Sequence, residues 1–432
     1  MIWGVSMMLV TGVTGELIFS SLVVSGLFLM SGGDSESWKI SLLGELDYIS
    51  WSLVMLSFWV LMLCALSSSW AKKTVNGCLF FLLNYSLLLG FLVSFYVSDY
   101  MFFYFSFESC LIPIFFMILG WGYQPERVQA GVYMLFYTLF GSLPLFFMFM
   151  WLTYEGLGYM YNFSVPEINT FYYVFLLSAF LVKFPMYSVH LWLLKAHVEA
   201  PLAGSMVLAG VLLKLGGYGL IRILPYWELS LKLVSELIVC LSLWGGLVVS
   251  LSCLRQMDMK LLIASSSVVH MSACIGGVLV MSEWGVKGSL LMMVSHGLCS
   301  SGLFFLANVV YSRSGSRSMS VSKGFLSLMP SMSLVWFLII VCNVGSPPSL
   351  NLLSEILLIS ALVNWNYLVM IVLGMTSFSV ACYSIFLFSM SQHGQFLKSK
   401  SGVQCGSSLE YLVSLTHWLP MNLGIMCVYS LS

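Results

Sequence analysis

The sequence predicts an all-α membrane protein that crosses the bilayer many times, and its composition and its apolar runs both lead to this fold class. Of the 432 residues, 60% are hydrophobic and only 8% are charged, whereas charged residues make up about 25% of an ordinary soluble domain. Apolar runs of roughly twenty residues, the length at which a helix crosses the hydrocarbon core, recur from end to end of the chain. A water-soluble protein of this size could not cover its surface with so few charges.

The apolar runs predict about fourteen transmembrane helices. The first two lie within 2–30 and are difficult to separate, because Glu16 stands inside a nearly continuous apolar stretch. The later spans are predicted near 49–70, 78–97, 100–120, 130–152, 170–194, 201–222, 232–253, 260–281, 286–310, 328–362, 366–390 and 409–431. The connections between them are short, and no soluble domain is predicted.

Charged residues in the loops predict how the chain is oriented. Basic residues concentrate in the loops that follow odd-numbered spans, namely Lys72, Lys73, Arg127, Lys195, Arg255, Lys260, Arg313, Arg317, Lys323, Lys398 and Lys400. The loops on the other side carry most of the acidic residues. By the positive-inside rule, the basic side faces the cytoplasm or the matrix, and the N-terminus faces the opposite compartment.

Prolines interrupt two of the predicted spans. Pro185 falls inside 170–194, and Pro347 and Pro348 fall inside 328–362. Paired Pro-broken segments in the two halves of a membrane protein are typical of inverted-repeat transporters whose sites lie near the bilayer midplane. The alternative is that these prolines merely kink their helices, which is common in membranes.

Several ionisable side chains lie far from the predicted ends of their spans. They are Glu108, Lys183, Lys214, His270, His296 and Glu355. At 1.5 Å per residue, Lys183 lies about 18 Å beyond Phe171, near the middle of a hydrocarbon core that is roughly 30 Å thick. A charge at such depth costs about 3 kcal/mol, so each of these groups is expected to face a partner or water.

Proton transfer is the chemistry that needs such groups. Burial disfavours the charged form of a side chain and a nearby opposite charge restores it, so a Glu–Lys pair that opens and closes can release or capture a proton. Histidine relays protons with little adjustment, because its charge changes near neutral pH. Serine hydroxyls on the same spans could anchor intervening waters, and these are Ser265, Ser266, Ser267, Ser272, Ser295, Ser300 and Ser301.

Each candidate also has a structural alternative. Glu108 and Lys183 could be an ion pair that only joins two helices, and Lys214 could extend its ammonium group to the interface. The two central histidines could be interhelical hydrogen-bonding groups, and Glu355 could cap the helix that starts after the second break. Near the basic interface, the side chains interpreted as solvated or as shaping a loop entrance are His190, His197 and Glu199.

Motifs for redox chemistry and for nucleotide hydrolysis are not found in the sequence. The eleven cysteines form no C-x-x-C pair and no iron–sulfur or zinc spacing. There is no Walker A loop, no dinucleotide-binding G-x-G-x-x-G, no haem-ligand pair of histidines in one span and no nucleic-acid patch. The energy for transport is therefore expected to come from an ion gradient or from a partner.

Several stretches resemble the chain 4 family of NADH-ubiquinone oxidoreductase, the mitochondrial respiratory complex I. They are WGYQPERVQAGVYMLFYTLFGSLPL (121–145), VKFPMYSVHLWLLKAHVEAPLAGSMVLAGVLLKLGGYGLIR (182–222), SSSVVHMSACIGGV (265–278), SHGLCSSGLFFLANVVYSR (295–313) and PPSLNLLSE (347–355). The resemblance covers roughly 80–400 and is highly specific. The regions before and after it match mainly in hydropathy.

The resemblance implies an antiporter-like membrane subunit with fourteen core helices in two inverted five-helix repeats. We expect N-terminal helices over 1–77, the repeats over 78–225 and 226–395, and a C-terminal helix over 396–432. Glu108 matches the family's fifth-helix glutamate, Lys183 the seventh-helix lysine paired with it, and Lys214 the eighth-helix lysine. His270 and His296 match the central relay histidines, and Glu355 matches the glutamate on the broken twelfth helix.

The same resemblance implies a proton-translocating subunit that couples pumping to electron transfer elsewhere in the complex. No cofactor is expected in this chain, because the NAD, FMN, iron–sulfur clusters and ubiquinone belong to the rest of the complex. The expected partners are neighbouring membrane subunits and the lipid of the mitochondrial inner membrane, with the N-terminus on the intermembrane-space side. A stand-alone sodium/proton antiporter subunit and a purely structural scaffold are the alternatives.

Overall fold

The computed structural model describes residues 38–41, 44–68, 71, 76–160, 170–223, 232–395 and 405–427, and most of these residues are helical. The first two predicted spans, with Glu16, lie outside the described residues. Within the described residues, each predicted span from 49 onward lies mainly on helix, and the two spans with internal prolines, 170–194 and 328–362, are divided into separate helices. The prediction of an all-α polytopic membrane protein is confirmed, and the count of fourteen helices stays a prediction.

The elements of the first half run as follows along the chain. They are β1 Trp38–Ser41, β2 Gly44–Leu46, α3 Tyr48–Ser67, α4 Gly77–Tyr96, α5 Tyr100–Ser109, α6 Leu111–Trp121, α7 Arg127–Tyr154, α8 Thr170–Lys183, α9 Leu191–Glu199, α10 Leu202–Val207, the π-helical turn η2 Leu208–Leu212 and α11 Leu213–Ile223. The strands β1 and β2 pair antiparallel, with Trp38 opposite Leu46. This small hairpin was not predicted, because strands of three or four residues are too short to show a periodic pattern.

All the named elements in the described part of the second half are helices, joined by short loops. Its elements are α12 Lys232–Cys253, α13 Met259–Leu279, α14 Glu283–Ser314, α15 Phe325–Leu328, α16 Pro330–Val344, α17 Leu350–Trp365, α18 Val369–Gln392, α19 Ser408–Leu423 and η4 Gly424–Cys427. Within the described part of the chain, nine helical stretches are long and apolar enough to cross a membrane. The interrupted helices α8, α16 and α17 are apolar but shorter.

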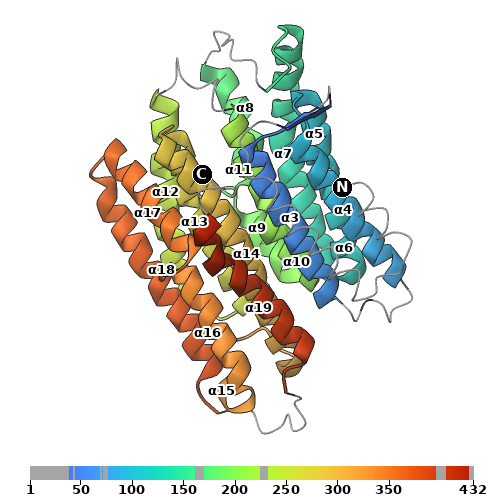
Figure 1. The fold of residues 1–432 in the computed structure, drawn as a ribbon, viewed down its shortest axis with the longest axis vertical. Coiled ribbons are helices and arrows are strands. Elements are labelled where there is room, and N and C mark those ends of the chain that lie inside the picture. Colours follow the sequence, from blue (N-terminus) through green and yellow to red (C-terminus); the bar gives the residue numbers. More distant parts are fainter. Residues whose placement is uncertain are drawn as a thin grey trace.

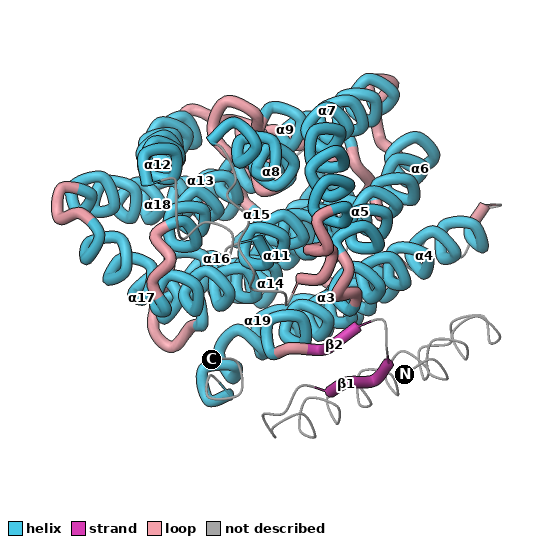
Figure 2. Tube along the Cα trace, turned by 90° about the horizontal axis from the view of Figure 1, so that it is seen from above, coloured by secondary structure: helices cyan, strands magenta, loops and turns pink. Residues whose placement is uncertain are grey.

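The helices form one bundle in which central helices are enclosed by peripheral ones. Figures 1 and 2 show α11 and α14 in the middle, α4, α5 and α6 on one side, and α17 and α18 on the other. The apolar windows of 202–223 and of α14 are wholly buried inside the protein, whereas α7 and α18 expose large apolar side chains such as Phe140 and Phe378. The outer surface is therefore suited to lipid or to other membrane subunits.

The first interruption lies between α8 and α9, at Pro185. Proline has no backbone N–H, so a helix that contains it loses a hydrogen bond. Here the N–H of Met186 donates to the Leu181 carbonyl at 3.1 Å. The indole N–H of Trp192, from the other side of the break, donates to the Val182 carbonyl at 3.0 Å. The carbonyls that the break releases are thus satisfied inside the protein.

The second interruption lies between α16 and α17. The C-terminal end of α16 and the N-terminal end of α17 each have their own cap. Gly345 ends α16 with φ of 80°, a left-handed conformation that favours glycine. The peptide bond between Pro347 and Pro348 is cis. The hydroxyl of Ser349 accepts a hydrogen bond from the N–H of Leu352 and so caps the start of α17. The predicted pair of Pro-broken helices is therefore present in the structure.

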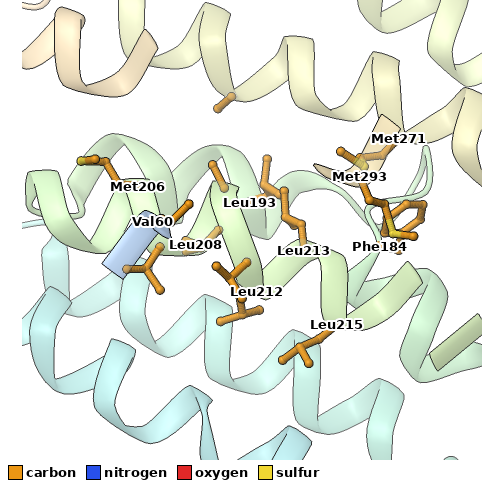
Figure 3. Packing of buried hydrophobic residues seen from close by; sticks show 14 of the residues in the cluster. Val60, Phe184, Leu193, Met206, Leu208, Leu212, Leu213, Leu215, Met271 and Met293 are labelled. Carbon is orange, nitrogen blue, oxygen red and sulfur yellow. The ribbon is translucent and has the colours of Figure 1, made fainter. Parts of the chain in front are cut away.

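Apolar packing holds the middle of the bundle around the π-helical turn. Figure 3 shows side chains of η2 and α11, including Leu208 and Leu212, near Val60 of α3. Gly210 allows this close approach, because a Cβ at its position would lie 2.9 Å from a methyl group of Val60. The segment that precedes Lys214 is consequently fixed by close packing on its neighbours.

Candidate functional site

Glu108 and Lys183 form an ion pair between α5 and α8. The Oε1 atom of Glu108 lies 3.5 Å from the Nζ atom of Lys183, and the lysine side chain is only 1% exposed. Lys183 also donates to the Phe107 carbonyl at 2.8 Å, and its Nζ lies 3.0 Å from the centre of the Phe107 ring. The buried ammonium group is therefore stabilised by a carboxylate, a carbonyl and an aromatic face together.

The position of Lys183 follows from the break in its helix. Lys183 is the last residue of α8, where the helix dipole presents partial negative charge and favours a cation. Neither carboxylate oxygen of Glu108 has a hydrogen-bond partner in the described part of the chain. The lysine is therefore the main source of stabilisation that the structure shows for the glutamate charge, and movement of either side chain would alter both.

Lys214 lies on α11, directly after the π-helical turn, and it is fully buried. Its Nζ donates to the Ala209 carbonyl at 2.6 Å and lies 3.3 Å from Nδ1 of His296. Single π turns inside helices are frequent at functional sites. An extended lysine that reaches the membrane interface is excluded by this geometry, because the side chain folds back onto η2 and towards α14.

The contacts continue from Lys214 through the two histidines to Glu355. The rings of His296 on α14 and His270 on α13 have their centres 5.3 Å apart. Nδ1 of His270 lies 3.9 Å from Oε1 of Glu355 on α17. The structure therefore brings Lys214, His296, His270 and Glu355 into one line of neighbouring side chains, which we call the central line.

Asn351 bonds Glu355 within α17 and also reaches across the second break to α16. Asn351, one turn earlier on α17, donates to Oε1 of Glu355 at 3.2 Å and to the Asn343 carbonyl at 3.3 Å. The hydroxyl of Ser295 on α14 donates to Asn351 at 3.1 Å. The alternative that Glu355 caps α17 is wrong, because Ser349 occupies that position. Asn351 was missed in the sequence, although its i, i+4 spacing from Glu355 could have indicated it.

An apolar contact separates the Glu108–Lys183 pair from the central line. Phe184 follows Lys183, and Met293 lies one turn before His296 on α14. Figure 3 shows their side chains next to each other. They meet over Gly217, where a Cβ would collide with the Met293 sulfur and the Phe184 ring. The two groups of ionisable residues are therefore neighbours with apolar side chains between them.

Most serines expected to anchor water already use their hydroxyl protons within their own helices. Ser266, Ser267 and Ser272 each donate to a backbone carbonyl three residues earlier. Ser295 differs, because it also reaches Asn351 on another helix. The hydroxyls of the other serines can still accept hydrogen bonds, so their contact with water stays a prediction.

A second buried polar cluster lies near the basic side, where solvated side chains were expected. His197 is fully buried, with its ring stacked on Phe304 at 4.7 Å between centres, and Glu199 is 5% exposed. Glu199 pairs with Arg317 at 3.2 Å. Lys260, counted as a loop residue in the sequence, is 3% exposed and donates to the Ala200 carbonyl at 3.3 Å. The interpretation of His197 and Glu199 as solvated is wrong, because α9 packs against α13 and α14.

No group of three or more His, Cys, Asp and Glu side chains is placed to hold a metal ion among the residues that the structure describes. The chemistry that the site itself offers is proton binding and transfer.

A membrane-spanning helical bundle that buries a line of ionisable side chains defines an ion- or proton-translocating membrane protein. Comparison with protein families specifies this class further. Residues 97–380 match the family described as NADH:quinone oxidoreductase/Mrp antiporter, TM, and residues 1–95 match NADH-ubiquinone oxidoreductase chain 4, amino terminus. The chain belongs to the NADH-ubiquinone oxidoreductase chain 4 family.

Relatives and solved structures agree with this assignment. The chain is similar to NADH-ubiquinone oxidoreductase chain 4 of Ceratitis capitata, with 49% identity over 90% of this chain and 88% of that protein. It is 48% identical to chain 4 of Aedes aegypti over 88% of this chain and 86% of that protein. Its fold matches a chain of respiratory complex I from Thermus thermophilus with a TM-score of 0.88 and 22% identity, over 99% of this chain and 96% of that one.

Family membership favours a membrane subunit of the respiratory NADH-ubiquinone oxidoreductase over a stand-alone sodium/proton antiporter. The animal relatives and the many apolar helices place it as a multi-pass protein of the mitochondrial inner membrane.

Proposed function

We propose that this chain carries protons through the membrane arm of NADH-ubiquinone oxidoreductase along the central line, under the control of the Glu108–Lys183 pair. The observation that carries the proposal is the contact of Lys214 with His296 at 3.3 Å, in the buried centre of the bundle. A lysine that only stabilises the fold does not require a titratable side chain beside it, whereas a lysine that transfers protons requires one to accept the proton.

The Glu108–Lys183 pair acts as a switch in this mechanism. At 3.5 Å the two charges stabilise each other, and in a medium of low dielectric constant that interaction is strong. Moving one side chain removes the interaction and changes the proton affinity of the other. A change of conformation transmitted from elsewhere in the complex thereby becomes a change in proton occupancy.

The central line passes the proton across the middle of the membrane. Lys214 releases its proton towards His296, the two histidine rings exchange it, and His270 delivers it to Glu355. The ring centres are 5.3 Å apart, and Nε2 of His270 has no hydrogen-bond partner among the described residues. The distance of 3.9 Å between Nδ1 of His270 and Oε1 of Glu355 exceeds a direct hydrogen bond. Transfer therefore uses a bridging water or a small rotation of a side chain.

The wider assignment adds further expectations about energy, partners and orientation. The energy comes from electron transfer in other subunits, and this chain holds no redox group of its own. Its neighbours are other membrane subunits of the complex, including antiporter-like ones. Protons enter from the basic side, which faces the matrix, and the N-terminus faces the intermembrane space.

The test is proton pumping by the whole complex reconstituted in vesicles. Glu108→Gln and Lys183→Met are expected to lower the number of protons pumped per NADH oxidised. Lys287→Met is the matched control, because Lys287 is an exposed residue near the start of α14. A structural scaffold is the correct interpretation if both site variants assemble and pump at the unmodified stoichiometry.

The antiporter alternative is tested by purification. A subunit of the oxidoreductase copurifies with a large NADH-oxidising assembly, whereas a stand-alone antiporter is recovered without that activity and exchanges sodium for protons in vesicles.

A further inference from the structure

Asn351 on α17 carries a buried amide that the proposed proton path does not use. The residue is 1% exposed. Its side-chain nitrogen donates to Oε1 of Glu355 at 3.2 Å and to the Asn343 carbonyl of α16 at 3.3 Å. Its side-chain oxygen accepts from the Ser295 hydroxyl of α14 at 3.1 Å. One amide thus joins Glu355 to two neighbouring helices.

These partners fix the orientation of the amide. An asparagine side chain has two N–H donors and one acceptor oxygen. The Asn343 carbonyl and an ionised Glu355 only accept hydrogen bonds, so the nitrogen has to face them and the oxygen faces Ser295. Turning the amide over would place its oxygen against two acceptors in a buried site, which is costly. Asn351 therefore presents a fixed N–H donor to Glu355.

The carboxylate oxygen that accepts from Asn351 also faces the histidine pair. Oε1 of Glu355 lies 3.9 Å from Nδ1 of His270. Oε2 lies against the turn that ends α16, since a Cβ at Gly345 would be 2.7 Å from it. The carboxylate is therefore held between Gly345 and Asn351, with Oε1 towards His270.

The hydrogen bond from Asn351 affects how strongly Glu355 binds a proton. A donor to a carboxylate stabilises the charged form and so opposes protonation. Hydrogen bonds in series strengthen one another, so the bond from Ser295 makes the amide a stronger donor to Glu355. Because Ser295 belongs to α14 and Asn343 to α16, a movement of either helix against α17 changes the orientation of the amide. The proton affinity of Glu355 then rises as the donor turns away.

We propose that Asn351 is a positioning residue that directs Oε1 of Glu355 towards His270 and makes the proton affinity of Glu355 depend on the arrangement of α14, α16 and α17 at the second break. This inference rests on the proposed function and adds a control at the last residue of the central line. It differs from the Glu108–Lys183 switch, because a neutral amide, and not an opposite charge, changes the proton affinity.

The pH dependence of pumping reports this role. In the proposed path Glu355 has to release its proton in every cycle, so a higher proton affinity moves the acid side of the pumping profile to higher pH. Besides His270, the titratable groups that interact electrostatically with Glu355 include Cys274 of α13, Cys299 of α14 and Tyr383 of α18. These groups stay the same in every variant compared below, so a shift of the profile reports the change in the amide.

Asn351→Leu in the complete complex, reconstituted in vesicles, is the first test, because leucine has a similar size and no polar atoms. The quantity measured is the number of protons pumped per NADH oxidised as a function of pH. We expect the acid side of the profile to move up by about 1–2 pH units, which corresponds to the loss of a hydrogen bond to a charged group.

The matched control is Asn84→Leu, in which an asparagine that is 6% exposed loses a donor to the Phe80 carbonyl of its own helix, α4, at 2.9 Å. We expect its pumping profile to match that of the unmodified complex. If Asn351→Leu lowers pumping at every pH without shifting the profile, Asn351 only stabilises the fold and the inference is wrong.

Ser295→Ala tests the link to α14 with a smaller change in the core. We expect the profile to move in the same direction by about half a pH unit, because the amide keeps its N–H groups but loses the bond that orients it. Ser289→Ala, on the same helix, is the control, since its buried hydroxyl donates to the Val286 carbonyl at 2.8 Å. If Asn351→Leu does not assemble, this pair decides, and equal profiles for the two serine variants overturn the inference.

Comparison with Lys183→Met separates this inference from the proposed function. If Lys183→Met lowers pumping while Asn351→Leu and Ser295→Ala keep the profiles of their controls, the role of Asn351 is wrong and the proposed function stands. If Lys183→Met pumps at the unmodified stoichiometry, the proposed function itself is wrong.

Discussion

The two interrupted membrane helices differ in how the backbone groups at the break are hydrogen-bonded. At the first break a side chain crosses the gap, since the Trp192 indole N–H donates to the Val182 carbonyl. At the second break each end is completed locally, by Gly345 at the end of α16 and by Ser349 at the start of α17. The first break is therefore held by a contact between its two halves, and the second by standard helix caps.

The breaks also differ in which half-helix carries the charge. Lys183 is the last residue of α8, at the negative end of that helix dipole, whereas Glu355 lies in the second turn of α17, closer to a positive end. The cation and the carboxylate thus each occupy the half-helix whose dipole favours them. In this chain, the sign of the ionisable group near each break matches the dipole of the half-helix that carries it.

Removing the cation at the first break is expected to have the largest effect on stability. Lys183→Met leaves Glu108 without its counter-charge, and breaking a buried ion pair from one side costs about 3–5 kcal/mol. The thermal midpoint of the purified complex measures this loss. The double variant Glu108→Gln/Lys183→Met is expected to recover most of it, because no unpaired charge remains. Equal losses in the single and double variants would contradict this account of the pair.

Substitution of Gly345, the residue with left-handed backbone conformation at the second break, is expected to have the next largest effect on stability. Gly345→Ala introduces a side chain at φ of 80°, where its Cβ would lie 2.7 Å from Oε2 of Glu355. Strain of this kind costs about 2–3 kcal/mol, and the displaced carboxylate should also lower proton pumping. Gly374→Ala is the control, because a Cβ there meets nothing within 4 Å. If both variants behave alike in thermal unfolding, Glu355 does not depend on the turn at Gly345.

The side-chain bridge at the first break is expected to contribute less. Trp192→Phe keeps an aromatic ring but removes the donor to the Val182 carbonyl, which costs about 1–2 kcal/mol for a buried acceptor. Trp244→Phe changes an indole that is 60% exposed and serves as the control. An unchanged thermal midpoint in Trp192→Phe would mean that the carbonyl of Val182 finds another donor.

The sequence predicts the helices well because apolar runs and prolines are local signals. The breaks at Pro185 and at Pro347 and Pro348, and the depth of Lys183, follow directly from such signals. The pairing of Glu108 with Lys183 could be stated only as a hypothesis, which the family resemblance supports, since nothing local shows that residues so far apart in the chain lie 3.5 Å from each other.

Three-dimensional packing accounts for what the sequence could not show. The burial of His197 and Lys260 depends on the packing of α9 against α13 and on the stacking of His197 on Phe304 of α14, which no periodic pattern reveals. The π-helical turn before Lys214 is equally hidden, because its residues are ordinary apolar ones.

The smallest expected effect concerns the cap of α17, and it tests whether the second break is held by local caps. Ser349→Ala removes the acceptor for the Leu352 N–H and should cost about 1 kcal/mol. Ser360→Ala, inside the same helix, removes a hydroxyl that only donates to the Leu357 carbonyl and should be neutral or slightly stabilising, since alanine favours helix. The difference between the two thermal midpoints measures the cap. If Ser349→Ala unfolds at the temperature of Ser360→Ala, the start of α17 is fixed instead by Asn351, whose amide joins Glu355 to the Asn343 carbonyl across the break.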